Sequence, residues 1–130
     1  MSAKAAGPGP DLSIVAGSTR TDWVFKISHA GGNNITGSRV IMNIGYVYDP
    51  ARGVDDVRLT KDTVDATEAV FVNASEGTVR FYMSPNDTRG GAAPLTVGTY
   101  FYDIWLEIGG DWYAATTPGK LTVVGGVGLD

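Results

Sequence analysis

Hydrophobic and polar residues alternate with a period of two along most of the chain, which is the pattern of a strand with one buried face. In residues 21–27 the apolar side chains Trp23, Phe25 and Ile27 alternate with more polar neighbours. The same alternation recurs at 12–16, 40–46, 57–61, 69–72, 79–83, 99–108 and 121–124. These segments predict an all-β protein of about seven to nine short strands.

The segment 99–108 differs from the others because it carries aromatic residues on both of its faces. Tyr100 and Tyr102 share one side, and Phe101 and Trp105 lie on the opposite side. A strand that is apolar on both faces usually lies at the centre of a sheet or contacts a partner. We therefore expect one of the two aromatic sets to form a contact surface.

Glycine and proline mark the turns between the expected strands. Gly109 and Gly110 supply the positive φ values of a tight hairpin, so residues 99–108 are expected to pair with 112–116. A serine–proline pair followed by an aspartate predicts one short helical turn near 84–89. Short strands with glycine-rich turns and one such helical turn predict an antiparallel, immunoglobulin-like β-sandwich.

The length and composition fit one turn-rich domain. The chain has 130 residues, of which 43% are hydrophobic and 18% are charged, and this balance is typical of a folded domain rather than of a disordered chain. The 18 glycines are about twice the usual frequency, as expected for many turns. We expect a flexible N-terminal arm at 1–11, a sandwich at 12–124 and a short C-terminal tail at 125–130.

Charge and residue types argue against several kinds of partner. The net charge is -4 and no basic run occurs, which disfavours nucleic acid. No apolar run approaches the roughly 18 residues that cross a bilayer, and the first residues lack the apolar segment of a signal peptide. Without cysteine there is neither a disulfide nor a thiolate metal site. We therefore expect no nucleic-acid partner and no membrane partner.

Catalytic and metal-binding signals are weak. His29 is the only histidine and no G-x-S-x-G segment accompanies it, so a small hydrolase is the weakest hypothesis. The spacings typical of zinc sites and EF-hand loops are absent, although Asp55-Asp56 or Asp62-Asp65 could hold a calcium ion in a loop. We expect no enzyme activity, cofactor or bound metal. The sequence offers no way to choose a glycosidase pair among its candidate carboxylates. These are Asp55, Asp56, Asp62, Asp65, Glu68, Glu76, Asp103, Glu107 and Asp111.

The aromatic residues outnumber what a small sandwich needs in its core. The chain contains three Trp, six Tyr and four Phe residues. Surface rings stack on sugars in carbohydrate-binding modules, and assembly proteins bury such rings between subunits. Both a carbohydrate-binding or adhesion module and a subunit of an assembly are therefore compatible with the sequence.

Residues 59–124 resemble the β-sandwich domain of tailed-phage structural proteins, best known as the N-terminal domain of the phage baseplate upper protein (BppU) family. The resemblance extends in outline over most of the chain and is sharpest at 77–124. The motifs that carry it are Gly17-Ser18-Thr19 before Trp23-Val24-Phe25, then Ser84-Pro85-Asn86-Asp87-Thr88, Gly98-Thr99-Tyr100-Phe101-Tyr102-Asp103-Ile104, and Thr116-Thr117-Pro118-Gly119-Lys120-Leu121-Thr122-Val123.

The resemblance implies a non-enzymatic virion protein, made in the host bacterial cytoplasm, whose partners are other virion proteins and copies of itself. Because the chain ends at Asp130, where baseplate proteins of this family continue, we expect a decoration, cement or adaptor subunit rather than a receptor-carrying one. Its arm and sheet edges are expected to pack on a capsid, neck or baseplate lattice. The residues expected to contact partners are Leu12, Ile14, Phe101, Trp105, Trp112, Val127 and Leu129.

Overall fold

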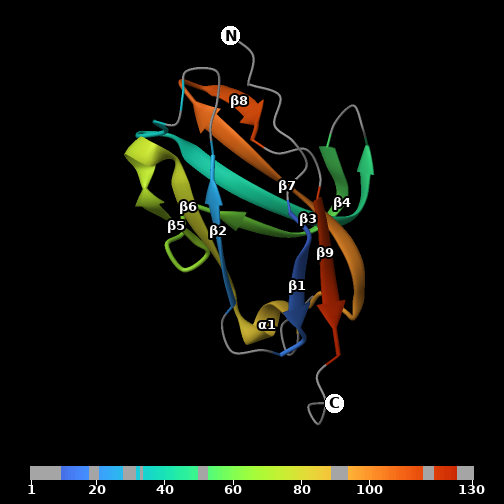
Figure 1. Cartoon of the computed structure of the whole chain (residues 1–130). Helices are drawn as coiled ribbons and strands as arrows, with labels where there is room; N and C mark the ends of the chain where they lie inside the picture. The colour runs from blue at the N-terminus through green and yellow to red at the C-terminus, as the bar shows by residue number, and fades with distance from the viewer. Residues whose placement is uncertain are drawn as a thin grey trace.

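The computed structural model describes residues 10–17, 21–27, 32, 34–49, 53–88, 94–115 and 119–125. These residues contain nine strands, one 3-10 turn and one short helix (Figure 1). In chain order the elements are β1 (Leu12–Val15), β2 (Thr21–Lys26), β3 (Arg39–Asp49), β4 (Gly53–Asp62), β5 (Ala69–Asn73), η1 (Ala74–Glu76), β6 (Thr78–Met83), α1 (Pro85–Thr88), β7 (Gly98–Ile108), β8 (Asp111–Ala114) and β9 (Gly119–Val124).

The strands form two sheets that face each other. The large sheet has six strands in the order β1-β9-β7-β3-β4, with β8 pairing with β7, and the small sheet has the order β2-β6-β5. One edge of β7 pairs with β3, and the other edge pairs first with β9 and then with β8. The predicted β-sandwich with one short helical turn is confirmed, and β7 lies inside the large sheet as its two apolar faces predicted.

The pair of β1 and β9 is the one departure from the antiparallel arrangement among the described strands. Residues 12–15 run parallel to residues 121–124. The alternation of apolar residues indicates which face of a strand is buried, but it carries no information on the direction of the neighbouring strand. The sequence pattern therefore predicted both strands without revealing that they run the same way.

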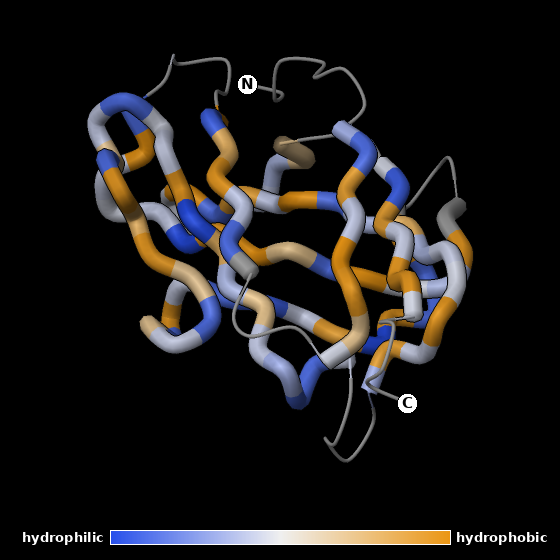
Figure 2. Tube along the Cα trace, turned by 60° about the horizontal axis from the view of Figure 1, so that its bottom comes forward, coloured by the Kyte–Doolittle hydropathy of each residue, from blue (hydrophilic) through white to orange (hydrophobic). Residues whose placement is uncertain are grey.

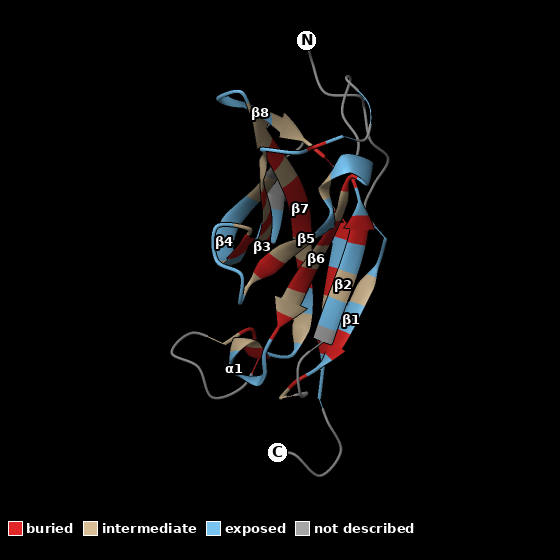
Figure 3. Ribbon diagram, turned by 90° about the vertical axis from the view of Figure 1, so that its left-hand side faces the viewer, coloured by how far each residue is buried: buried red, intermediate tan, exposed pale blue. Residues whose placement is uncertain are grey.

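The inner faces of the two sheets form the hydrophobic core. Tyr100, Tyr102, Ile104 and Leu106 of β7 are fully buried, and Phe25 of β2 reaches Tyr102 across the sandwich with ring centroids 6.0 Å apart. Hydrophobic and hydrophilic residues alternate along the strands (Figure 2). Buried residues alternate with more exposed ones along β6 and, apart from the buried Asp103, along the middle of β7 (Figure 3). Burial of each large apolar side chain contributes about 1.5–3 kcal/mol.

The hydroxyl group of Tyr102 joins the segment before β1 to the middle of the large sheet. It donates a hydrogen bond to the carbonyl oxygen of Pro10. Burial raises the pKa of Tyr102, and the negative charge of Asp11 acts in the same direction. The phenol therefore stays protonated and remains a donor to Pro10 at neutral pH.

The short helix α1 is tied to the body of the protein by its polar side chains. The carboxylate of Asp87 accepts hydrogen bonds from the backbone N–H of Ser84 (2.7 Å) and from the buried Nζ of Lys61 (2.8 Å). Thr88 Oγ1 accepts a hydrogen bond from the N–H of Gly17 (2.8 Å). This ion pair fixes α1 on β4, because separating the two groups would leave a buried charge without a partner.

Among the residues that the structure describes, no helix is long and apolar enough to span a membrane.

Candidate functional site

The outer face of the large sheet carries the second aromatic set of β7. Phe101, Asp103 and Trp105 alternate with the buried residues of the inner face and so lie on the opposite side of the strand. Phe101 and Trp105 are partly exposed, whereas Asp103 is only 2% exposed. The structure thus places one aromatic set of β7 in the core and the other outside it.

The hairpin between β7 and β8 brings a further indole ring to this face. Gly109 and Gly110 have φ values of 63° and 86°, which suit a tight primed turn, and the predicted pairing of the two strands is confirmed. Trp112 lies opposite Glu107 in the register, on the same side of the sheet as Trp105. Its side chain is 42% exposed.

The end of the β3–β4 hairpin folds over the same face and forms a groove with it. The backbone N–H of Val54 donates a hydrogen bond to Asp103 Oδ2 at 2.8 Å, which explains why this carboxylate is buried in an otherwise outward-facing row. The groove between the hairpin and β7–β8 has a volume of about 320 Å³. Its walls are formed by Ile41, Asn43, Val54, Trp105 and Trp112.

A bulge gives the hairpin its bend. The register of β3 with β4 shifts between Ile44 and Gly45, and Asp56 of the opposing strand has a φ of 49°. A Cβ atom on Gly45 would lie 2.4 Å from the carbonyl oxygen of Asp55, a distance that no side chain tolerates. Because bulges bend the strand that contains them, the glycine lets the hairpin close on the outer face.

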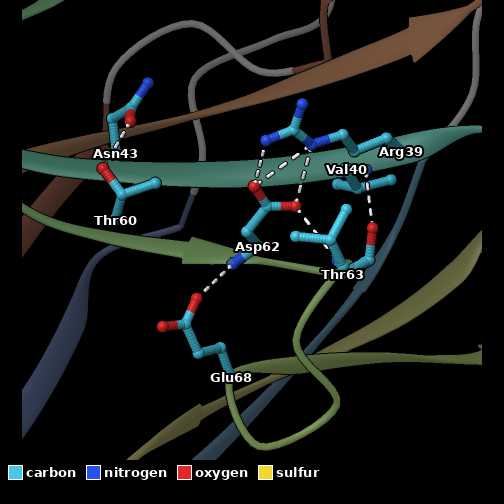
Figure 4. A network of polar contacts seen from close by, with 8 residues as sticks. Arg39, Val40, Asn43, Thr60, Asp62, Thr63 and Glu68 are labelled. Atoms are coloured by element: carbon cyan, nitrogen blue, oxygen red, sulfur yellow. Dashed lines mark hydrogen bonds and ion pairs between the residues drawn. The ribbon is translucent and has the colours of Figure 1, made fainter.

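An ion pair supports one end of the groove. Arg39 Nε donates hydrogen bonds to both carboxylate oxygens of Asp62, at 3.0 and 3.1 Å, and the N–H of Asp62 donates to Glu68 Oε1 (Figure 4). These contacts lower the pKa of Asp62 and raise the pKa of Arg39, so the pair is charged at neutral pH. The guanidinium carbon lies 5.7 Å from the centroid of the Trp112 ring and holds that ring by a cation–π contact.

The structure brings together some of the residues that were expected to contact partners, and separates others. Phe101, Trp105 and Trp112 share the outer face of the large sheet. Leu12 and Ile14 lie in β1, where Leu12 packs against the core and Ile14 is buried within it. Val127 and Leu129 lie outside the described residues. A role of these residues in contacting partners stays a prediction.

Sequence reasoning missed three residues that line the groove. Ile41 and Asn43 occupy the outward positions of a strand whose inward positions were recognised, so the period of two was a usable signal for them. Val54 gave no such signal, because it reaches the groove only through the bulge and the fold-over of the hairpin. Alternation along a strand does not encode a bend of this kind.

Two of the carboxylates considered for a calcium ion, those of Asp56 and Asp65, are held in local contacts. Asp56 pairs with Arg58 at 3.1 Å, and Asp65 Oδ1 accepts hydrogen bonds from the N–H and the hydroxyl group of Thr67. Among the described residues, no three His, Cys, Asp or Glu side chains lie close enough together to hold a metal ion. His29 lies outside the described residues.

The fold is similar to that of the N-terminal domain of phage TP901-1 ORF48, the baseplate upper protein. The TM-score is 0.54 and the identity 16%, over 87% of this chain and 83% of that chain. The resemblance to the BppU domain is thereby confirmed at the level of the fold. Drosophila OTK, extracellular domains 3-5, gives a TM-score of 0.38 with 14% identity over 91% of this chain and 34% of that chain, too low a similarity to support an argument. No protein-family model and no curated protein matches the sequence.

Proposed function

We propose that the protein is a non-enzymatic structural component of a phage virion, acting as a decoration, cement or adaptor subunit that packs beside other virion proteins. The observation that carries the proposal is the similarity of its fold to a phage baseplate domain over most of both chains. A packing subunit needs surfaces that bind proteins and needs no converging catalytic groups. A comparison of the two edges of the large sheet indicates where such a surface lies.

The two edges of the large sheet differ in how they are protected. The β4 edge contains the bulge and the exposed charged residues Asp55, Asp56 and Arg58. Bulges and charges at an edge prevent another strand from pairing with it. The opposite edge is β1, whose four residues Leu12–Val15 include no charge. The β1 edge is therefore the better candidate for accepting a strand from a neighbouring virion protein.

The backbone geometry of β1 identifies a residue with which to test this surface. The N–H of Ala16 donates to the carbonyl oxygen of Val124 at 2.8 Å, so even-numbered residues of this segment direct their backbone groups toward β9. Backbone groups of successive residues point to opposite edges of a strand. The N–H of Ser13 consequently points away from β9, toward the side where an added strand would pair.

The experiment compares Ser13→Pro with Ser13→Ala. Proline removes the outward N–H donor and is tolerated at a sheet edge, whereas alanine removes only the side-chain hydroxyl. Purified virions produced with each variant would be analysed by quantitative mass spectrometry for the copy number of this chain. We expect wild type and Ser13→Ala to be present at the same copy number, and Ser13→Pro to be reduced about tenfold, as loss of about 1.4 kcal/mol of binding free energy predicts.

Circular dichroism and thermal unfolding of the isolated variants would establish that both remain folded. Equal incorporation of a folded Ser13→Pro variant would exclude β1 as the packing edge. Absence of the wild-type chain from purified virions would overturn the structural role itself.

A further inference from the structure

The groove on the outer face of the large sheet has the size of a small-molecule site. Its volume of about 320 Å³ lies at the lower end of the range found for ligand pockets, roughly 300–1,000 Å³. Apolar and aromatic walls with a few fixed polar groups are the usual composition of such a site. Ile41, Val54, Trp105 and Trp112 supply the apolar walls, and Asn43 supplies a polar group.

Among the described residues, Asn43 is the polar residue that lines the groove, and its side-chain amide can donate a hydrogen bond to a ligand. Asn43 Oδ1 accepts a hydrogen bond from Thr60 Oγ1 at 3.0 Å, which directs the amide nitrogen of Asn43 to the other side (Figure 4). Asp103 lies directly across from Asn43 on β7. Asp103 Oδ2 binds the N–H of Val54, whereas the buried Asp103 Oδ1 has no hydrogen-bond partner among the described residues.

The amide donor of Asn43 favours a ligand that carries hydroxyl oxygens, because these accept hydrogen bonds. The buried carboxylate of Asp103 lies behind the groove, where it is directly across from Asn43 and accepts the hydrogen bond from Val54. An apolar peptide side chain in the groove would leave the amide donor of Asn43 without a partner.

The aromatic walls are held in place before any ligand binds. Trp105 is fixed on the central strand, and Trp112 is held by the guanidinium group of Arg39, which Asp62 in turn holds by two hydrogen bonds from Nε. A ring that is already oriented loses little conformational entropy when a ligand stacks on it. The positive charge of Arg39 is paired with Asp62, and the described residues that line the groove carry no charge.

We propose that this groove binds a neutral pyranose sugar, as a single ring or as the end of a short glycan. The C–H groups on one face of a pyranose carry partial positive charge and stack on the negative face of an indole ring. Its hydroxyl oxygens accept hydrogen bonds, which matches the amide donor on Asn43. This activity goes beyond the packing role and does not depend on it, because the β1 edge and the groove lie on different parts of the large sheet.

The test is a titration of the full chain with maltose, lactose and N,N′-diacetylchitobiose, followed by tryptophan fluorescence. We expect saturable binding of at least one of them, with half-saturation on the order of millimolar, as an open groove that buries few groups predicts. Trp112→Ala removes a half-exposed ring and should weaken binding about five- to tenfold without unfolding the domain. Asn43→Asp removes the amide donor at constant size and should weaken binding similarly.

The matched control is Trp23→Phe, which replaces a tryptophan of the small sheet and should leave the affinity unchanged. Ser13→Pro should also bind sugar normally, so a failure of the packing role and a failure of the sugar site are distinguishable. The proposal is overturned if none of the three sugars binds, or if Trp112→Ala and Asn43→Asp both bind as tightly as wild type. Loss of virion incorporation in Trp112→Ala without any sugar binding would assign the face to a protein contact instead.

Discussion

The Asp62 carboxylate accepts hydrogen bonds from the side chain of Arg39 and from the backbone N–H of Val64. These contacts lower its pKa, and the hydrogen bond from Arg39 is the largest cause. A carboxylate with a lower pKa in the folded than in the unfolded state stabilises the fold above its unfolded pKa, and this stabilisation is lost as pH falls through the folded value. Asp62 therefore contributes stability at neutral pH that disappears on acidification below about pH 4.

At the scale of this residue we predict that Asp62→Asn destabilises the protein more at pH 7 than at pH 2. The amide keeps the size of the side chain but removes the charge, so the expected loss in the free energy of unfolding at pH 7 is about 1–2 kcal/mol. At pH 2, where the wild-type carboxyl is largely protonated, the difference should shrink to about 0.5 kcal/mol or less. Urea unfolding at both pH values measures this, with the exposed Asp111→Asn as control. The same loss at both pH values would contradict the prediction.

At the scale of the element, the bulge in the β3–β4 hairpin shows why one strand was predicted only in part. The alternating pattern predicted residues 57–61, whereas β4 spans Gly53–Asp62. The bulge interrupts the alternation of apolar and polar residues. Asp55 and Asp56 lie within the strand, although aspartate is a residue type typical of turns. The regular strands β2, β6 and β7, where no shift interrupts the pairing of β6 with β2 or of β7 with β3, were predicted almost to their ends.

One glycine of this hairpin and one glycine of the β7–β8 turn are required for different reasons, and their substitution gives a prediction. In Gly45→Ala the new Cβ would lie 2.4 Å from a backbone oxygen, so the hairpin must shift, and we expect a loss of about 2–3 kcal/mol in unfolding free energy. In Gly109→Ala the space is open and only the positive φ of 63° is unfavourable, so about 1 kcal/mol is expected. Chemical unfolding measures both losses. A smaller loss for Gly45→Ala than for Gly109→Ala would show that the bulge is not closely packed.

At the scale of the whole molecule, the sequence predicted the fold better than the site. The period of two placed Phe101 and Trp105 on one side of β7, and the double glycine placed Trp112 on the adjoining strand. Formation of the groove depends in addition on Val54 and Asp103, which are 49 positions apart and meet through one hydrogen bond. Local patterns carry no information on a contact between residues so far apart in the sequence. The formation of the groove could therefore not be predicted from the sequence.

A second long-range contact, between the Tyr102 hydroxyl and the Pro10 carbonyl, joins residues 92 positions apart and closes the sandwich at β1. We predict that deletion of residues 2–9 changes the free energy of unfolding by about 0.5 kcal/mol or less, because Pro10 remains. Deletion of residues 2–11 should lower it by about 1–3 kcal/mol, because the buried phenol then has no acceptor.

Tyr102→Phe in each background separates this loss from a general effect of shortening the chain. Phenylalanine removes the donor, so it should destabilise the full chain by about 1 kcal/mol and should be neutral or stabilising in the 2–11 deletion, where it removes an unpaired hydroxyl group. Thermal and urea unfolding of the four proteins give the coupling energy between Tyr102 and the segment that holds Pro10. If Tyr102→Phe has the same effect in both backgrounds, the two sites are independent, and the hydrogen bond to Pro10 does not hold β1 against the sheet.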